Sequence, residues 1–100
     1  MDYVNAIAKV RFSSAKPQRV VLHKGQAITA ELFCLEPGQH VTADRGEWTY
    51  YVVAGTAQFS HAGQSVVLPT GQLACACADE VHKISNDGEQ RLVCLAVGKM

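Results

Sequence analysis

The sequence predicts an all-β domain whose strands either close into a barrel or pack as two sheets. Valine dominates the aliphatic β-branched residues, with twelve Val against three Ile, and such residues favour strands. Short apolar runs alternate with turn residues about every ten positions, which is typical of sandwiches and barrels. Helical spacing occurs only at Val4, Ile7 and Ala8, a segment too short to be stable alone. Since an open sheet would expose long edges, we expect a closed or double-sheet arrangement.

Eight strands are expected in one domain that spans residues 1–100, after an irregular lead-in over residues 1–18. The strongest turn signal is Asp87-Gly88, which predicts a type I′ hairpin between the last two strands. The expected strands are the apolar, β-branched segments between the turn signals: Arg19–His23, Thr29–Leu35, Trp48–Val53, Thr56–Ser60, Ser65–Leu68, Leu73–Ala78, Val81–Ser85 and Arg91–Val97.

Length and charge exclude several classes of protein. One hundred residues suffice for one domain with its own core. Nine basic and nine acidic residues cancel, so no charge excess would attract nucleic acid or an anionic membrane. The longest apolar runs, such as LVCLAV, are far shorter than the ~20 residues that span a bilayer, and the start does not resemble a signal peptide. We therefore expect a cytoplasmic protein with neither nucleic acid nor membrane as partner.

Four cysteines are expected to be reduced in that compartment. Cys34, Cys75, Cys77 and Cys94 all lie in apolar runs, where Cys behaves as a small hydrophobe. Cys75 and Cys77 are spaced for one face of a strand, so both sulfurs could point at a shared cavity. No second CxxC or His-x-x-His pair accompanies them, and the sequence therefore does not predict a structural zinc site.

The segment from Gly71 to Asn86 resembles the second cupin motif, G-x5-P-x-G-x2-H-x3-N. Gly71, His82 and Asn86 match that pattern, whereas Cys77 stands in place of Pro and Asp79 in place of the second Gly. The first motif of the family, G-x5-H-x-H-x3,4-E-x6-G, is degenerate here.

Two fragments of that first motif remain. Pro37-Gly38 resembles its start and residues 51–55, YVVAG, resemble its closing YVLEG; fifteen residues then separate Gly55 from Gly71. Over residues 35–97 the chain thus resembles a small single-domain cupin of the RmlC-like class. The resemblance implies a jelly-roll β-barrel, also called a double-stranded β-helix, with a pocket inside.

Many cupins hold a divalent metal on two His and one Glu of the first motif and one His of the second, and His82 falls on the last position. Counting back from Gly55 places Trp48 on the Glu position, and Thr42 and Asp44 on the two His positions. Because side chains alternate across a sheet, Glu47 and Trp48 cannot both point inward.

This count back from Gly55, called the direct count below, predicts that Trp48, Tyr50 and Val52 face the interior. His82 would then be a pocket histidine bonded to Asn86 or to a backbone carbonyl, and His40 a solvent-facing loop residue.

A bulge at Arg45-Gly46 gives the alternative register, in which Glu47 turns inward. His40, Glu47 and His82 would then form a 2-His-1-carboxylate set for iron, manganese, nickel or zinc.

The leading functional hypothesis is a cupin that binds a small molecule in a mostly apolar pocket without a catalytic metal. Its expected walls are Trp48, Tyr50, Cys75 and Cys77, with His82 as the titratable polar contact. One alternative is a metal-dependent cupin enzyme, a dioxygenase or isomerase of a small organic molecule. Another is a sensory or interaction module. Because the sequence contains no Ser-His-Asp arrangement, phosphate-binding Gly loop or carboxylate pair, catalysis would depend on the metal.

A homodimer is the expected assembly. The resemblance implies it, since small cupins commonly pair, and a net charge of zero opposes association only weakly. Exposed strand edges also invite a second chain. Tyr51, outward in the direct-count register, is the expected anchor of the contact.

Overall fold

Nine strands and one short 3-10 helix make up the fold. The computed structural model describes residues 1–99, and the chain enters the first strand after an irregular segment that contains η1 (Ile7–Lys9). The described residues contain no helix with the length and apolar character that crossing a membrane requires. The strands are β1 (Gln18–Lys24), β2 (Thr29–Leu35), β3 (His40–Ala43), β4 (Glu47–Ala54), β5 (Thr56–His61), β6 (Gln64–Pro69), β7 (Leu73–Ala76), β8 (His82–Ser85) and β9 (Leu92–Lys99).

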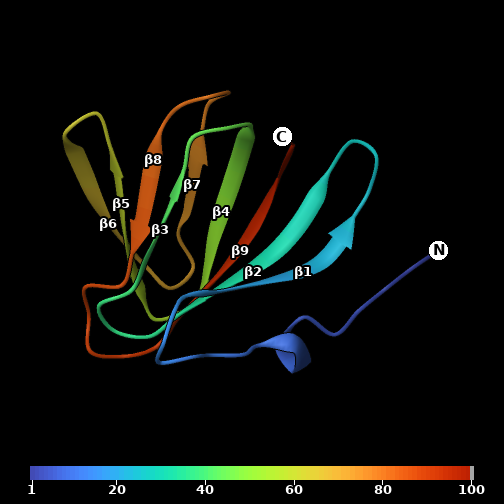
Figure 1. Ribbon diagram of the computed structural model, residues 1–100, viewed down its shortest axis with the longest axis horizontal. Helices are drawn as coiled ribbons and strands as arrows, with labels where there is room; N and C mark the ends of the chain where they lie inside the picture. Colours follow the sequence, from blue (N-terminus) through green and yellow to red (C-terminus); the bar gives the residue numbers. More distant parts are fainter. Residues whose placement is uncertain (100) are drawn as a thin grey trace.

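Two antiparallel sheets face each other (Figure 1). One has five strands in the order β1-β2-β9-β4-β7, and the other has four in the order β3-β8-β5-β6. Successive strands often fall in different sheets, so the chain crosses repeatedly between them. This is the arrangement of a jelly roll, and the predicted all-β, cupin-type barrel is confirmed.

The core lies between the sheets and follows the alternation of side chains along each strand. In β4, Trp48, Tyr50 and Val52 are buried, while Glu47 and Tyr51 are exposed. The direct-count register is therefore confirmed, and the alternative with Glu47 turned inward is wrong. The inner cluster consists of Phe33, Leu35, Trp48, Tyr50, Val52, Ala57, Leu68, Ala76, Ile84, Leu92, Cys94 and Ala96.

A second apolar cluster lies on the outer face of the five-stranded sheet. Buried Leu32 and Cys34 of β2 belong to it, and Val10 and Phe12 from the lead-in pack against it. The guanidinium of Arg91 lies 4.6 Å from the centre of the Phe12 ring. The irregular N-terminal segment thus covers part of the outer face and belongs to the fold.

Two expectations about the strands need correction. His40–Ala43, expected as loop, is the short strand β3, which pairs with β8; its alternation of exposed and half-buried residues spans too few positions to be recognised in the sequence. Asp87-Gly88 does not form a hairpin, because β8 and β9 belong to different sheets.

Hydrogen bonds from the buried Asn86 explain why the chain changes sheet at this point. Its side-chain amide donates to the carbonyls of Leu35 and Gln90, and its oxygen accepts from the backbone N–H of Gly88. The two-residue hairpin occurs at Ala62-Gly63 instead, between β5 and β6, with φ of 51° and 77°. Positive φ at both positions is the signature of a type I′ turn.

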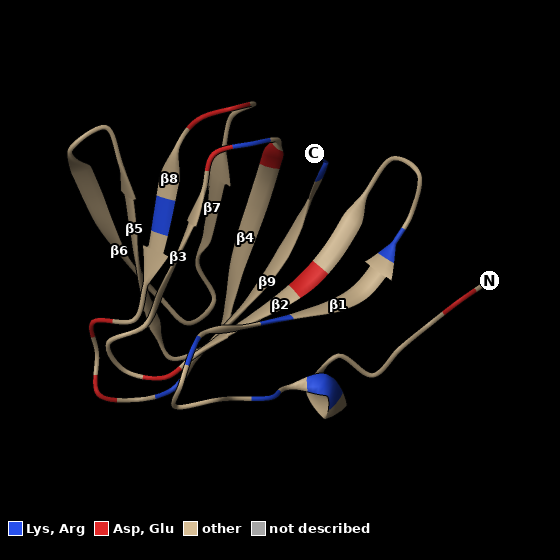
Figure 2. Cartoon of the chain, in the orientation of Figure 1, with Lys and Arg blue, Asp and Glu red and all other residues tan. Residues whose placement is uncertain are grey.

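Charges of both signs are spread over the strands and loops (Figure 2). Several are paired across the fold: Arg19 of β1 with Glu31 of β2 at 3.1 Å, and Arg91 with Glu36 at 2.9 Å.

Candidate functional site

An aromatic cluster fills the barrel interior at the end where β4 begins and β5 ends. Its members are Phe33, Trp48, Tyr50, Phe59 and His82. Tyr50 lies at the centre, with ring centroids 5.3 Å from His82, 5.6 Å from Phe33, 5.9 Å from Phe59 and 6.4 Å from Trp48. The His82 and Phe59 rings are stacked at 5.4 Å. Five rings from four strands, β2 and β4 of one sheet and β5 and β8 of the other, thus occupy the space between the sheets.

His82 is closed off from solvent, and both of its ring nitrogens have partners. It is 2 % exposed. Nδ1 lies 2.7 Å from the carbonyl oxygen of Glu80, which can only accept, so Nδ1 carries a proton. Nε2 lies 2.6 Å from the Tyr50 hydroxyl, which donates to it in the neutral tautomer. No lone pair of His82 is then left for a metal or a ligand while Tyr50 remains in place.

Tyr50 is held as the neutral phenol. Burial raises the pKa of its hydroxyl well above its ordinary value of 10, because the interior penalises the phenolate. At physiological pH the hydroxyl therefore remains a hydrogen-bond donor to His82. The predicted backbone-carbonyl partner of His82 is confirmed in Glu80, whereas the other predicted partner, Asn86, bonds elsewhere.

Trp48 lies between this cluster and a cavity beside the sheet. Its indole N–H donates to the carbonyl of Arg45 at 2.9 Å, and its ring packs directly over Gly98 of β9. A Cβ at Gly98 would lie 2.5 Å from the indole carbons, so the absence of a side chain there makes room for the ring.

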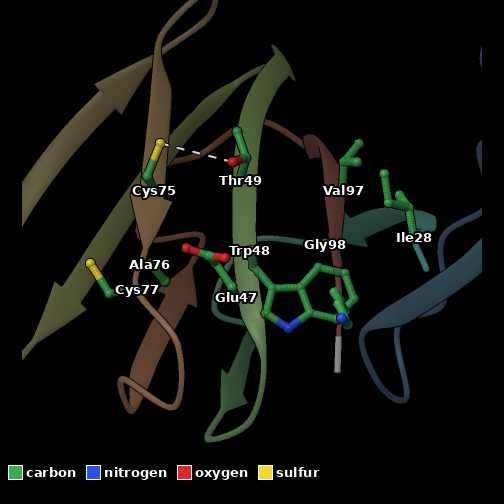
Figure 3. A pocket seen from close by; sticks show the side chains of 10 residues that line it. Ile28, Glu47, Trp48, Thr49, Cys75, Ala76, Cys77, Val97 and Gly98 are labelled. Carbon is green, nitrogen blue, oxygen red and sulfur yellow. Dashed lines mark hydrogen bonds between the residues drawn. The ribbon is translucent and has the colours of Figure 1, made fainter.

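The cavity has a volume of about 350 Å³ and is shown in Figure 3. Apolar groups and two thiols form its walls, and Glu47 and Lys99 supply opposite charges at its rim. Its lining residues are Ile28, Glu47, Trp48, Thr49, Cys75, Ala76, Cys77, Val97, Gly98 and Lys99.

The predicted pocket residues thus fall into two neighbouring groups. Trp48, Cys75 and Cys77 line the cavity, whereas Tyr50 and His82 are buried behind Trp48 in the aromatic cluster. Sequence spacing alone did not separate the groups, because Trp48 and Tyr50 share the buried face of β4 and only Trp48 reaches the cavity. Cys75 reaches the cavity from the outward side of β7, where it is exposed.

The predicted alternative metal ligands are not brought together. His40 and Glu47 are exposed, whereas His82 is buried. In the pairing of β3 with β8, His40 lies opposite Ser85 and His82 lies opposite Ala43. His40 is therefore about 10 Å along the strand from His82, at ~3.3 Å per residue.

The direct-count positions do not supply a metal site either. Thr42 is exposed and Trp48 has no metal-binding atom. Within residues 1–99 no three His, Cys, Asp or Glu side chains are grouped to hold a metal ion. The residues present therefore do not fit the metal that the family commonly carries.

One polar feature of this region was not predicted from the sequence: an ion pair beside the aromatic cluster. Glu31 is 7 % exposed, and Arg19 bonds it through two nitrogens, at 3.3 and 3.1 Å. The Arg19 guanidinium lies 4.9 Å from the centre of the Phe33 ring. The signal that could have identified it is Glu31, a charged residue in the run ELFCL that lies two positions before Phe33 and so on the same, inward face of the strand.

A two-sheet antiparallel barrel with an enclosed histidine at the start of β8 defines the chain as a double-stranded β-helix protein. Its sequence matches the family described as Cupin domain over residues 31–98. The match covers more than half of the chain, and the protein belongs to the cupin family. No curated protein sequence matches it significantly.

Several solved structures are similar in fold. The TT1209 protein from Thermus thermophilus has a TM-score of 0.92 at 20 % identity, covering 99 % of this chain and 97 % of that one. A protein with a double-stranded β-helix domain from Klebsiella pneumoniae has a TM-score of 0.89 at 23 % identity, covering 99 % and 90 %. A cupin superfamily protein from Desulfitobacterium hafniense has a TM-score of 0.83 at 17 % identity, covering 100 % and 93 %. At these identities the likeness shows the fold alone.

Proposed function

We propose that this cupin binds a small organic molecule in the cavity beside Trp48 and that it does so without a catalytic metal. The observation that carries the proposal is the pairing of Tyr50 with His82. Because this hydrogen bond and the surrounding rings occupy the interior, the accessible space lies at Trp48 rather than around the histidine.

The walls of the cavity favour a ligand with an apolar body and a polar group. The Trp48 ring, Ile28 and Val97 supply apolar surface, and Glu47 and Lys99 lie directly opposite each other on β4 and β9. A ring or short chain could pack on the apolar wall while one charged group pairs with the rim. Sites of this kind combine apolar walls with a few placed polar groups.

Trp48 provides the assay, because it is the only tryptophan in the chain. Its emission should be blue-shifted, weakly quenched by iodide and altered by small aromatic or aliphatic ligands that enter the cavity. Trp48→Phe removes the signal, so binding to that variant is measured calorimetrically and should be weaker. Val66→Ala, on the exposed edge strand β6, is the matched control. A screen of such ligands that leaves the emission and the heat unchanged would refute the proposal.

Metal content provides a second, independent test. Protein purified without a His-tag should carry well under one equivalent of iron, manganese, nickel or zinc. A near-stoichiometric metal that is lost in His82→Ala would support a metal-dependent enzyme instead.

We also propose that the protein works in the cytoplasm as a homodimer. All four cysteines are free. The uncovered part of the outer sheet face carries Tyr51 of β4 and Leu73 of β7, which pair across the two strands and are 42 % and 55 % exposed. A second copy of this face would cover both side chains.

A further inference from the structure

We propose that the ligand of the cavity beside Trp48 is a zwitterion, namely a free α-amino acid with an apolar side chain. Its ammonium group pairs with Glu47, its carboxylate pairs with Lys99, and its side chain lies on Ile28 and Val97. The inference rests on the proposed function, because it names the class of ligand for the same cavity.

One face of two neighbouring strands carries both charges and part of the apolar wall. Glu47 of β4 lies directly opposite Lys99 of β9, and Thr49 lies opposite Val97 two residues further along. Residues that are directly opposite, or two apart on one strand, have their side chains on the same face. The charged pair therefore lies at the end of the two strands, and the less polar pair lies next to it on the same side.

The two charges are both open to a ligand. Directly opposite residues have Cβ atoms ~5 Å apart, which is close enough for Glu and Lys side chains to pair. Among the residues that the structure describes, however, neither Glu47 nor Lys99 takes part in an ion pair. Figure 3 shows the Glu47 carboxylate extended from β4 toward β7, away from β9. A ligand can thus bind the carboxylate and the ammonium group without first breaking a salt bridge.

The apolar wall has exposed surface that a ligand can cover. Ile28, in the connection between β1 and β2, is 53 % exposed, and Figure 3 shows it beside Val97. Covering this surface with an apolar group removes it from water and favours binding. The cavity volume of about 350 Å³ is near the lower end of the ~300–1,000 Å³ range of ligand sites, which suits a single small molecule.

The charges of the cavity disfavour a ligand that carries only one charge. Of the described residues that line it, only Glu47 and Lys99 are charged. A simple carboxylate brings its charge close to Glu47, and a simple amine brings its charge close to Lys99, so each meets a like charge. An α-amino acid carries both charged groups on one carbon atom and the side chain on the same atom. This arrangement matches two opposite charges beside one apolar wall.

Four probes test the ligand class: L-phenylalanine, 2-phenylethylamine without the carboxylate, 3-phenylpropanoate without the ammonium group, and L-alanine without the ring. Binding is followed by Trp48 emission, excited where phenylalanine does not absorb, and by calorimetry. L-Phenylalanine should bind about 5-fold more tightly than either singly charged probe, which is the upper end of what an exposed ion pair contributes. L-Alanine should also bind more weakly, because it leaves the apolar wall uncovered.

Variants of the two charged residues test each contact separately. Glu47→Gln should weaken L-phenylalanine binding by about 5-fold without weakening 3-phenylpropanoate, which has no ammonium group. Lys99→Met should weaken L-phenylalanine equally without weakening 2-phenylethylamine, which has no carboxylate. Glu89→Gln and Lys83→Met, which remove exposed charges outside the cavity, are the matched controls and should change neither. Melting curves check that all four variants are folded.

Two results would overturn the proposal. One is a singly charged probe that binds as tightly as L-phenylalanine, and the other is an affinity for L-phenylalanine that Glu47→Gln and Lys99→Met leave unchanged. If the three phenyl probes alter Trp48 emission and bind equally, the proposed function stands and the zwitterion is excluded. If no probe alters the emission or produces heat, both proposals fail.

Discussion

Replacing Trp48 by alanine tests the packing on which the cavity depends. The side chain is 3 % exposed, stacks on Tyr50 and covers Gly98. Burial of an aromatic side chain removes ~150–250 Å² from water, which at ~25 cal/mol per Å² is worth about 4–6 kcal/mol as an upper estimate. Because neighbouring groups relax partly into the space, we expect Trp48→Ala to lower the free energy of unfolding by about 3–5 kcal/mol.

Urea unfolding followed by circular dichroism measures this loss without depending on the tryptophan. Glu47→Ala is the matched control, because Glu47 is the adjacent residue of the same strand and its side chain is exposed. Its effect should be within ~0.5 kcal/mol of zero, as for ordinary surface positions. Equal losses in the two variants, or a larger loss for Glu47→Ala, would refute the inward register of Trp48.

Three further predictions concern a close contact, pH and assembly. Gly98→Ala should lower the free energy of unfolding by about 1–3 kcal/mol and red-shift the tryptophan emission, because the added Cβ would overlap the indole. Gly88→Ala should do neither, because the nearest atom to an added Cβ there is 3.6 Å away. Burial raises the pKa of the Cys94 thiol to about 12 and also raises the pKa of the Tyr50 hydroxyl. As the pH rises, the unfolded chain therefore loses these protons before the folded protein does, and the free energy of unfolding falls. The expected slope is up to about 1.4 kcal/mol per pH unit for each group once it titrates in the unfolded chain, which for Cys94 is above pH ~9. Denaturant unfolding measures this, and a free energy of unfolding that stays constant from pH ~9 to ~11 would contradict the prediction. Sedimentation at tens of micromolar should show a dimer that Tyr51→Glu dissociates, and a monomer-sized wild-type species would exclude it.

The sequence predicted the architecture well because two signals acted together. Turn residues spaced about ten apart delimited most strands, and strict alternation along Trp48, Tyr50 and Val52 identified the inward face of β4. The strand β3 was missed because four residues carry too little alternation to be distinguished from loop. The Asp87-Gly88 turn was misread because a dipeptide records local backbone preference, whereas the change of sheet depends on long-range bonds from Asn86.

The candidate site was predictable only in part. Resemblance and alternation together identified Trp48 and His82 as inward residues, but neither reveals that Tyr50 occupies the hydrogen-bonding position of the His82 ring. That contact joins residues 32 apart in the sequence and depends on the distance between the two sheets. The cavity likewise depends on Gly98. The missing side chain there makes room for the Trp48 ring, and this follows only from the pairing of β9 with β4.

The protonation of the His82 ring shows whether Tyr50, rather than a metal, holds this histidine. Nitrogen-15 NMR of the imidazole distinguishes the protonated, bare and metal-bound states of each ring nitrogen. We predict a neutral ring with the proton on Nδ1 and a bare Nε2 that accepts from Tyr50, unchanged when Fe²⁺, Mn²⁺, Ni²⁺ or Zn²⁺ is added. A shift of the Nε2 resonance to that of a metal-coordinated nitrogen would show instead that a metal holds His82.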